Sequence, residues 1–267
     1  MITSSCSVTD APAGTTLSDQ PSRAMNYVFV DCRWELGRPE RGRELYLEGH
    51  IPGAAFLDVE RELSAPAAKP GGRHPLPSAE DFARAAGKAG IAPGAFVVAY
   101  DQGMTGGAAR LWWLLHHFGH DEVAVLAGGI GAWAGPLRAG EEEIEEVEFV
   151  PRPRADDTIE AEELERRLGA DGLVVLDARA PERYRGEVEP IDPVAGHIPG
   201  AWNLPFTDAS GIPPDVLDAP EVVVYCGSGI TACVDVLALA REGRDDVRLY
   251  AGSWSDWCSR GLPVETG

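Results

Sequence analysis

The sequence lacks any segment that could cross a membrane as a helix. Such a helix needs about 18 or more consecutive apolar residues, and the 267-residue chain has no run of this length. Residues 1–22 are rich in Ser, Thr, Pro and Ala, but they have neither the basic start nor the apolar stretch of a signal peptide. We therefore expect a cytoplasmic protein with a disordered tail over residues 1–23.

The sequence is also short of paired cysteines and of positive charge. Its five cysteines are an odd, widely spaced set without a Cys-x-x-Cys pair, which argues against a disulfide framework and against a zinc site. Lys and Arg number 23 against 43 Asp and Glu, so the formal net charge is −20. A chain of this charge repels nucleic acid and anionic lipid, and we expect neither as a partner.

An internal repeat is the main feature that the chain does have. The Asp-x-Arg motif at Asp31 recurs at Asp177, and the His-Ile-Pro-Gly-Ala motif at His50 recurs at His197. An apolar run before a glycine-containing loop and an Ala-Gly segment before a tryptophan also recur, in the same order. Residues that recur in both halves are expected to be structural rather than catalytic.

The repeat predicts two domains, over residues 24–138 and 158–267. The acidic and proline-containing stretch at residues 139–157 reads as an extended connector. In each half, short apolar runs alternate with helical patterns, which predicts an α/β fold whose mainly parallel sheets carry helices on both faces. In the second half, strands are expected near residues 173–177, 201–203, 222–225 and 247–250, and helices from Pro181, Thr231 and Ser253.

Cys226 lies where one of these strands turns into a helix, and ligands of such sheets bind at the carboxyl ends of strands. Gly227 and Gly229 let the loop curl so that successive backbone N–H groups point inward, and the next helix adds its positive N-terminal end. Both effects favour a thiolate. We therefore predict that Cys226 is a reactive nucleophile.

Several functions could use a thiolate held by backbone amides. A phosphatase of the Cys-x5-Arg type would need an arginine six residues after the cysteine, where this chain has Ala232. A cysteine hydrolase would need a base and an acyl pocket, which no local sequence clearly supplies. Sulfur transfer through a persulfide remains, because inward N–H groups would stabilise the terminal sulfur anion. A non-catalytic module that binds an anion or a partner is the alternative from another class.

The tandem halves, the two His-Ile-Pro-Gly-Ala motifs and the Cys226-Gly-Ser-Gly-Ile-Thr-Ala loop resemble two-domain sulfurtransferases of the rhodanese / 3-mercaptopyruvate sulfurtransferase superfamily, over residues 24–263. The resemblance implies two rhodanese-like domains, of which only the C-terminal one is active, and a persulfide on Cys226. Asp101 stands at the equivalent position of the first half, and a carboxylate cannot form a persulfide. We expect double displacement without a metal or organic cofactor.

The loop composition bears on the sulfur donor. Members that prefer thiosulfate resemble Cys-Arg-Lys-Gly, whose cations suit a dianion, whereas members that prefer 3-mercaptopyruvate resemble Cys-Gly-Ser-Gly, as here. This favours 3-mercaptopyruvate and keeps thiosulfate as the alternative. Arg183 matches the first of two substrate-binding arginines in mercaptopyruvate enzymes, but Ile191 stands near the place of the second. Arg185 is a candidate to compensate.

The resemblance implies further site residues. Ser228 would act with His74 and with an acidic residue, matched by Glu60, from the first half. His74 lies in a Pro/Gly-rich insertion that the second half lacks. The acceptor of the sulfur would be a low-molecular-weight thiol, a thioredoxin-like protein or cyanide. The loop amides expected to hold the persulfide belong to Gly227, Ser228, Gly229, Ile230 and Thr231.

Overall fold

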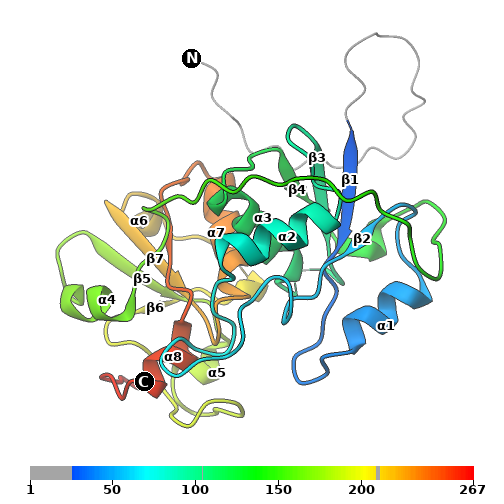
Figure 1. Cartoon of the computed structure of the whole chain (residues 1–267). Coiled ribbons are helices and arrows are strands. Elements are labelled where there is room, and N and C mark those ends of the chain that lie inside the picture. Colours follow the sequence, from blue (N-terminus) through cyan, green and yellow to red (C-terminus); the bar gives the residue numbers. More distant parts are fainter. Residues whose placement is uncertain (1–25, 104, 209–210) are drawn as a thin grey trace. The chain divides into compact units, whose positions relative to one another are not determined.

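The computed structural model describes residues 26–103, 105–208 and 211–267, so the tail predicted at residues 1–23 lies outside it. Within the described part of the chain, no helix is both long and apolar enough to cross a membrane. The chain divides into two compact units (Figure 1). The first contains the described residues up to Leu63 together with Pro77–Pro153, and the second contains Ser64–Leu76 and Arg154–Gly267.

The first unit is built on a four-stranded parallel sheet with the strand order β2-β1-β3-β4. Helix α3 packs against β3 and β4. The central strands are in register over their whole length, from Tyr27 opposite Phe96 to Asp31 opposite Tyr100. The elements are β1 (Tyr27–Asp31), α1 (Arg41–Glu48), β2 (Ala55–Phe56), α2 (Ala79–Lys88), β3 (Phe96–Tyr100), α3 (Gly107–His117), β4 (Val123–Val125) and the 3-10 helix η1 (Gly129–Ala132).

The second unit repeats this plan with the strand order β6-β5-β7-β8, again entirely parallel. The predicted α/β fold with two parallel sheets is therefore confirmed. The elements are α4 (Ala161–Arg167), β5 (Leu173–Asp177), α5 (Pro181–Tyr184), β6 (Trp202–Asn203), η2 (Phe206–Asp208), α6 (Pro214–Leu217), β7 (Glu221–Tyr225), α7 (Ala232–Arg241), β8 (Arg248–Leu249) and α8 (Ser253–Ser259).

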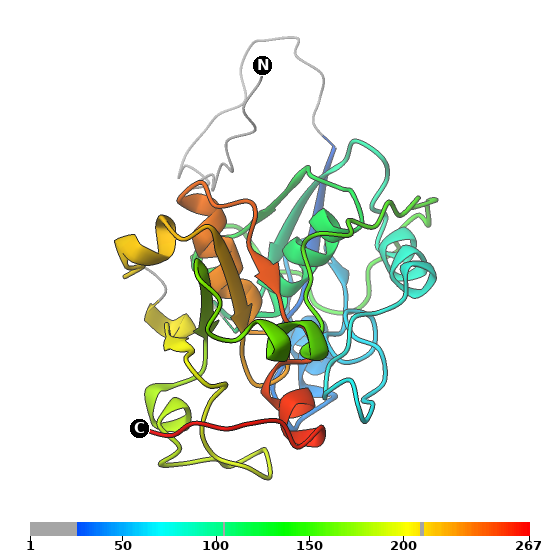
Figure 2. The ribbon, with the colours of Figure 1, turned by 90° about the vertical axis from the view of Figure 1, so that its left-hand side faces the viewer.

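Strand β7 and helix α7 form the centre of the second unit, and both can be followed by colour in Figure 2. Val222, Val223 and Val224 are completely buried, as expected for a parallel strand covered on both faces. Helix α7 packs against β7 and β8 and is itself mostly buried. The loop between β7 and α7 is thus held between two rigid elements.

The motifs shared by the two halves form the same buried contacts in each unit. Arg33 pairs with Asp31, and Arg179 pairs with Asp177, at 2.6 Å in both cases. The ring of His197 stacks on Tyr184 with 3.8 Å between centroids, and its Nδ1 lies 2.8 Å from the Tyr184 carbonyl. These residues hold each unit together, in agreement with the structural role predicted for repeated residues.

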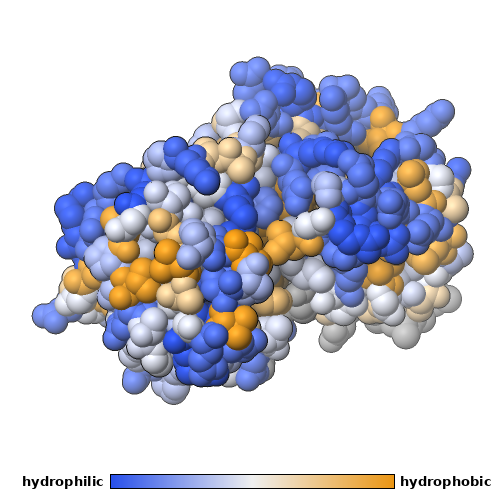
Figure 3. Space-filling view, turned by 90° about the horizontal axis from the view of Figure 1, so that it is seen from below, coloured by the Kyte–Doolittle hydropathy of each residue, from blue (hydrophilic) through white to orange (hydrophobic). Residues whose placement is uncertain are grey.

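Hydrophobic side chains that stay exposed are spread over both units. On the face shown in Figure 3, hydrophobic residues lie in groups among hydrophilic ones. Three of the exposed side chains, Val188, Ile191 and Val194, lie on the loop that follows α5. The polar residues of this loop take part in the site described below.

Candidate active site

The sulfur of Cys226 lies inside the loop between β7 and α7, at the carboxyl edge of the sheet. The side chain is almost fully buried, and the backbone N–H of Gly229 points at Sγ with an N···S distance of 3.1 Å. Gly229 has a φ of +82°, and a Cβ at this position would lie 2.4 Å from the Ala251 carbonyl oxygen. Only glycine fits there. The loop therefore curls around the sulfur as expected.

The start of helix α8 supports this loop from the other side. The N–H of Cys226 donates to Ser253 Oγ at 3.1 Å, and the N–H of Trp254 donates to the Cys226 carbonyl at 2.9 Å. Ser253 is fully buried and has a φ of +55°, which is uncommon for a residue with a side chain. Its position is fixed by the donation of its hydroxyl to the Tyr250 carbonyl. The sequence named Ser253 only as the start of a helix, because a left-handed serine has no sequence signature.

Ser228 and His74 meet beside Cys226. His74 Nδ1 lies 2.8 Å from Ser228 Oγ, and both side chains are buried. The segment Ser64–Leu76 is tied to helix α8, since the N–H of Gly71 donates to Asp256 Oδ1 at 2.6 Å. The N–H of Arg73 donates to Ser255 Oγ at 3.1 Å. These contacts fix the backbone on both sides of Gly72 and hold His74 in place.

Two arginines lie against the loop, and one of them was missed by the sequence analysis. Arg183 on α5 binds Glu189 through Nη2 at 2.7 Å, and its Nη2 lies 3.4 Å from Asp192. Arg73 pairs with the same Asp192 through Nη1. A Cβ on Gly227 would lie 3.0 Å from Arg73 Nη2 and 3.4 Å from Arg183 Nη1, so both guanidinium groups reach the residue after Cys226.

The residues considered for the second arginine position face elsewhere. Arg185 pairs with Glu187 on the surface, where both side chains are largely exposed. Ile191 is also exposed. The signal that could have identified Arg73 is its position directly before His74, which sequence reasoning had already chosen.

The two carboxylates beside the arginines differ in how firmly they hold their charge. Burial would raise the pKa of Glu189, but hydrogen bonds from Arg183 and from the Asp192 N–H outweigh it and lower the pKa. For Asp192, burial prevails over the attraction of Arg73, and its pKa is raised. Glu189 thus stays deprotonated more readily than Asp192, which is protonated more easily as the pH falls.

Comparison with known families decides the identity of this fold. A model of the rhodanese-like domain matches the chain twice, at residues 17–136 and at residues 160–260. The chain belongs to the rhodanese-like family. Within this family, the predicted repeat corresponds to two copies of one domain.

Rhodanese-like relatives cover most of the chain. “Probable 3-mercaptopyruvate sulfurtransferase” from Pseudomonas aeruginosa is 46% identical over 262 residues, or 90% of this chain and 92% of the relative. “Putative thiosulfate sulfurtransferase SseB” from Mycobacterium tuberculosis is 40% identical over 254 residues, or 86% and 87%. The crystal structure of SseA from Escherichia coli, described among 3-mercaptopyruvate sulfotransferases, matches with a TM-score of 0.72 and 32% identity, covering 86% and 93%. The chain is a sulfurtransferase, as predicted.

Glu60, the acidic residue that the rhodanese-like resemblance suggested, lies in the first unit after β2. Its N–H donates to Asp58 Oδ1 at 2.8 Å. Burial raises the pKa of the Glu60 carboxyl, and the nearby Asp58 carboxylate adds to this effect. Its part in catalysis stays a prediction. In the loop itself, Ile230 is buried and Thr231 is the N-cap residue of α7.

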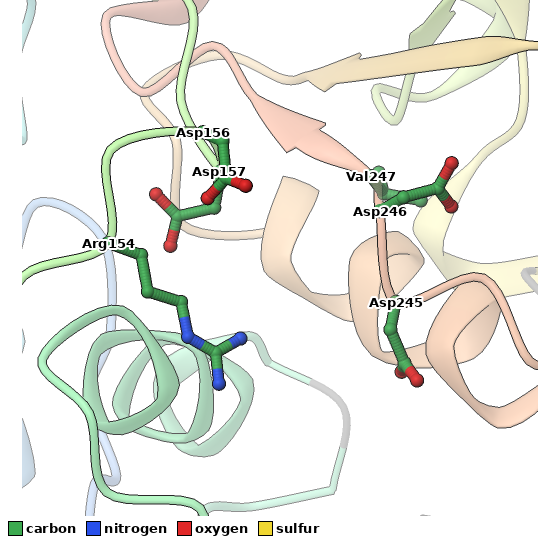
Figure 4. Close-up of a pocket in the computed structure, with 6 residues that line it drawn as sticks. All are labelled: Arg154, Asp156, Asp157, Asp245, Asp246 and Val247. Carbon is green, nitrogen blue, oxygen red and sulfur yellow. The ribbon is translucent and has the colours of Figure 1, made fainter.

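A hollow of about 400 Å³ in the second unit lies near the amino end of strand β8, away from the carboxyl ends of the strands where Cys226 lies (Figure 4). Residues 245–247 line it and lead into the amino end of β8, whereas Cys226 follows the carboxyl end of β7. Its lining includes Asp156, Asp157, Asp245 and Asp246. Carboxylates would repel an anionic sulfur donor, so this hollow does not suit the donor of a rhodanese-like enzyme.

Proposed function

We propose that this sulfurtransferase takes sulfur from 3-mercaptopyruvate and passes it through a persulfide on Cys226 to a thiol or to cyanide. The contact between Ser228 and His74 beside Cys226 is the observation that carries the choice of donor. When sulfur leaves 3-mercaptopyruvate, the carbon fragment departs as an enolate that needs a hydrogen-bond donor and then a proton. Thiosulfate releases sulfite, which needs neither.

In the first half-reaction, the Cys226 thiolate attacks the sulfur of 3-mercaptopyruvate and forms the S–S bond. The C–S bond breaks, and its electron pair stays on the carbon as the enolate of pyruvate. Ser228, which lies 2.8 Å from His74 Nδ1, would hydrogen-bond the enolate oxygen. The proton of the transferred sulfur goes to the enolate carbon, which leaves pyruvate and an anionic persulfide.

In the second half-reaction, an acceptor attacks the outer sulfur of the persulfide. The S–S bond breaks, and its electron pair returns to Cys226 as a thiolate. The acceptor becomes a persulfide if it is a thiol and thiocyanate if it is cyanide. A low-molecular-weight thiol and a thioredoxin-like protein are the acceptors we propose. Between the two half-reactions, the loop N–H groups, with that of Gly229 directed at Sγ, would stabilise the sulfur anion.

A thiosulfate preference is the second candidate, and the 40% identity to the Mycobacterium tuberculosis relative speaks for it. The loop side chains speak against it. Gly227, Ser228 and Gly229 carry no charge, and the arginines beside the loop are paired with Glu189 and Asp192. A dianion would therefore find little net positive charge at this site.

The test compares both donors on one preparation. We expect a higher kcat/KM for 3-mercaptopyruvate than for thiosulfate, and an increase of the Cys226 peptide by the mass of one sulfur atom after incubation with donor. Cys226→Ser should abolish the mass increase while circular dichroism stays unchanged. A preference for thiosulfate would refute the donor assignment. If the wild-type protein gains no sulfur from either donor, the site binds anions without catalysis.

A further inference from the structure

We propose that Asp256 on helix α8 is a positioning residue for sulfur transfer from 3-mercaptopyruvate. Its carboxylate binds the segment Ser64–Leu76, named the inserted arm below, and so keeps His74 against Ser228. Asp256 acts through the backbone of this arm rather than on the donor. The inference rests on the proposed function, in which Ser228 hydrogen-bonds the enolate of pyruvate.

The contact between His74 and Ser228 has to be directional if Ser228 is to serve the enolate. A hydroxyl has a single proton, so Ser228 cannot donate to an enolate while it donates to His74. His74 must instead donate from Nδ1 to Ser228 Oγ, across the 2.8 Å that separates them. This hydrogen bond leaves the Ser228 proton for the enolate. A displaced His74 would lose it, so the position of the arm decides how well Ser228 can act.

The inserted arm folds back on itself and exposes its tip to helix α8. The N–H of Ala68 donates to the Gly72 carbonyl at 3.1 Å, which closes a tight turn that contains Gly71. His74 follows directly after this turn. In Figure 1 the arm, drawn in light blue to cyan, passes α8. The place of His74 therefore depends on what holds the turn.

The Asp256 carboxylate binds this turn. Its Oδ1 accepts a hydrogen bond from the Gly71 N–H at 2.6 Å, a short distance that is typical of a charged acceptor. Tyr250 donates its hydroxyl to Oδ2 at 2.8 Å, and Arg260 Nε lies 2.8 to 2.9 Å from the two oxygens. Asp256 is only 2% exposed. Tyr250 and Arg260 thus orient the carboxylate, and the carboxylate holds the arm.

The same turn of α8 also holds the loop that carries the nucleophile. The N–H of Trp254 donates to the Cys226 carbonyl at 2.9 Å, and the next N–H along the helix donates to the Gly227 carbonyl at 3.0 Å. The hydroxyl oxygen of Ser255 accepts from the Arg73 N–H of the arm at 3.1 Å. The first turn of α8 is therefore the common support of the nucleophile and of the arm that carries the histidine.

The arm packs so closely on α8 that position 72 has to be glycine. Gly72 has a φ of +84°, and a Cβ there would lie 2.6 Å from the Gly252 carbonyl oxygen and 2.9 Å from Ser255 Oγ. This close packing does not depend on the Asp256 side chain, whereas the hydrogen bond of Gly71 does. Loss of the carboxylate should consequently loosen the arm without removing it from α8.

The experiment measures pyruvate release from 3-mercaptopyruvate by Asp256→Ala and Asp256→Glu, with Asp246→Asn as the matched control. Asp246 is an aspartate of the same unit that also pairs with an arginine, Arg244, at 2.7 Å. We expect Asp256→Ala to lower kcat about 10-fold to 100-fold, because a displacement of about 1 Å can cost on the order of 100-fold. Asp256→Glu keeps the charge and should recover part of the loss, and Asp246→Asn should behave as wild type.

A double-mutant cycle with His74→Asn distinguishes positioning from a general loss of stability. If Asp256 acts through His74, Asp256→Ala should lower kcat little further once His74 has been replaced. Inorganic polysulfide is a donor that releases no enolate. With it, Asp256→Ala and wild type should load Cys226 with sulfur equally fast, whereas a purely structural role would slow both donors alike.

The inference is overturned by an unchanged kcat in Asp256→Ala or in His74→Asn, by equal losses from Asp256→Ala with and without His74, or by an equal loss with polysulfide. None of these results alters the donor preference measured on wild type. If wild type itself releases no pyruvate, the proposed function falls and this inference with it. Should Asp256→Ala not fold, as judged by its melting curve, Ser255→Ala decides: its kcat should fall only when His74 is present, and an unchanged kcat overturns the inference.

Discussion

The loops after β3 and β7 follow one backbone plan, but they enclose different anions. In the first unit, the carboxylate of Asp101 accepts hydrogen bonds from three backbone N–H groups, those of Gly103, Thr105 and Ala108, at 2.7 to 3.3 Å. In the second unit, the described contact of the Cys226 sulfur is with one N–H group, that of Gly229. The Asp101 carboxylate thus occupies its loop with two oxygen atoms, whereas the second loop surrounds a single sulfur atom.

The surroundings of the two loops differ as well. Tyr46 stacks on His50 as Tyr184 stacks on His197, so the residue before each tyrosine is equivalent, and Leu45 in the first half stands where Arg183 stands in the second. The second unit also gains the segment Ser64–Leu76, which supplies Arg73 and His74. The two units thus have loops of the same plan, and only the second has a cysteine with the Ser228–His74 contact and two arginines beside it. The comparison teaches that the loop alone does not make the active site.

The largest effect should come from making the second loop like the first. We expect Cys226→Asp to lower sulfur transfer at least about a thousandfold, because a carboxylate cannot form a persulfide and loss of a nucleophile has effects of this size or greater. The assay measures pyruvate release together with the mass of the loop peptide. The fold should persist, since the first unit shows that the loop accommodates an aspartate.

The reciprocal change sharpens the same comparison. Asp101→Cys in the background of Cys226→Asp should not restore transfer, because the first unit has Leu45 where the second has Arg183. A persulfide at position 101 that turns over in this double variant would show that the loop is sufficient by itself, and would contradict the argument above.

A smaller effect is expected on stability. Asp101→Ala should lower the free energy of unfolding by about 1–3 kcal/mol, because it leaves one buried and two partly buried N–H groups without their acceptor. Cys226→Ala should lower the free energy of unfolding less, because one N–H group among the described contacts, that of Gly229, loses its partner. Chemical denaturation of both variants measures the difference. Equal losses would mean that the Asp101 carboxylate does not hold its loop together.

The strands and the loop around Cys226 could be predicted from the sequence because each is encoded by neighbouring residues. The apolar run at Val222–Val224 predicts a buried strand. Gly229 predicts a tight turn of the loop, and the structure shows this glycine in the left-handed conformation. The repeat then provided a comparison within one chain. Cys226 was accessible in this way, whereas Arg183 and the role of Ser228 followed from the family resemblance.

Contacts between distant segments could not be predicted. The pairing of Arg73 with Asp192 joins residues 119 positions apart, and nothing near Arg73 shows which loop it will meet. The left-handed conformation of Ser253 could not be predicted either, because it depends on the close approach of α8 to the Cys226 loop. Long-range packing, rather than local pattern, decides both.

The smallest effect concerns the helix behind each loop. Nine residues after Asp101 stands Arg110, and nine residues after Cys226 stands Asp235, and both side chains are fully buried. Both carboxyl oxygens of Asp235 have no hydrogen-bond partner in the described part of the chain. Burial raises the pKa of Asp235 well above its usual value, with further contributions from Cys226 and Asp177. The second unit thus has, in Asp235, an aspartate that resists deprotonation at the position where the first unit has the cation Arg110.

The raised pKa predicts how stability depends on pH. In the unfolded chain an aspartate loses its proton near pH 4, whereas folded Asp235 retains it to higher pH. Its contribution to stability is therefore full below about pH 4 and declines as the pH rises toward the folded pKa. Asp235→Leu should remove this decline and raise the free energy of unfolding by about 1 kcal/mol at pH 8, and by less at pH 4. Asp235→Asn keeps a buried polar group without a partner but cannot titrate. Its melting temperature should therefore lose the decline with rising pH, while its free energy of unfolding should rise less than that of Asp235→Leu. If Asp235→Asn melts with the pH dependence of wild type, the buried acid is not the group that couples folding to protons, and the contrast with Arg110 has no energetic consequence.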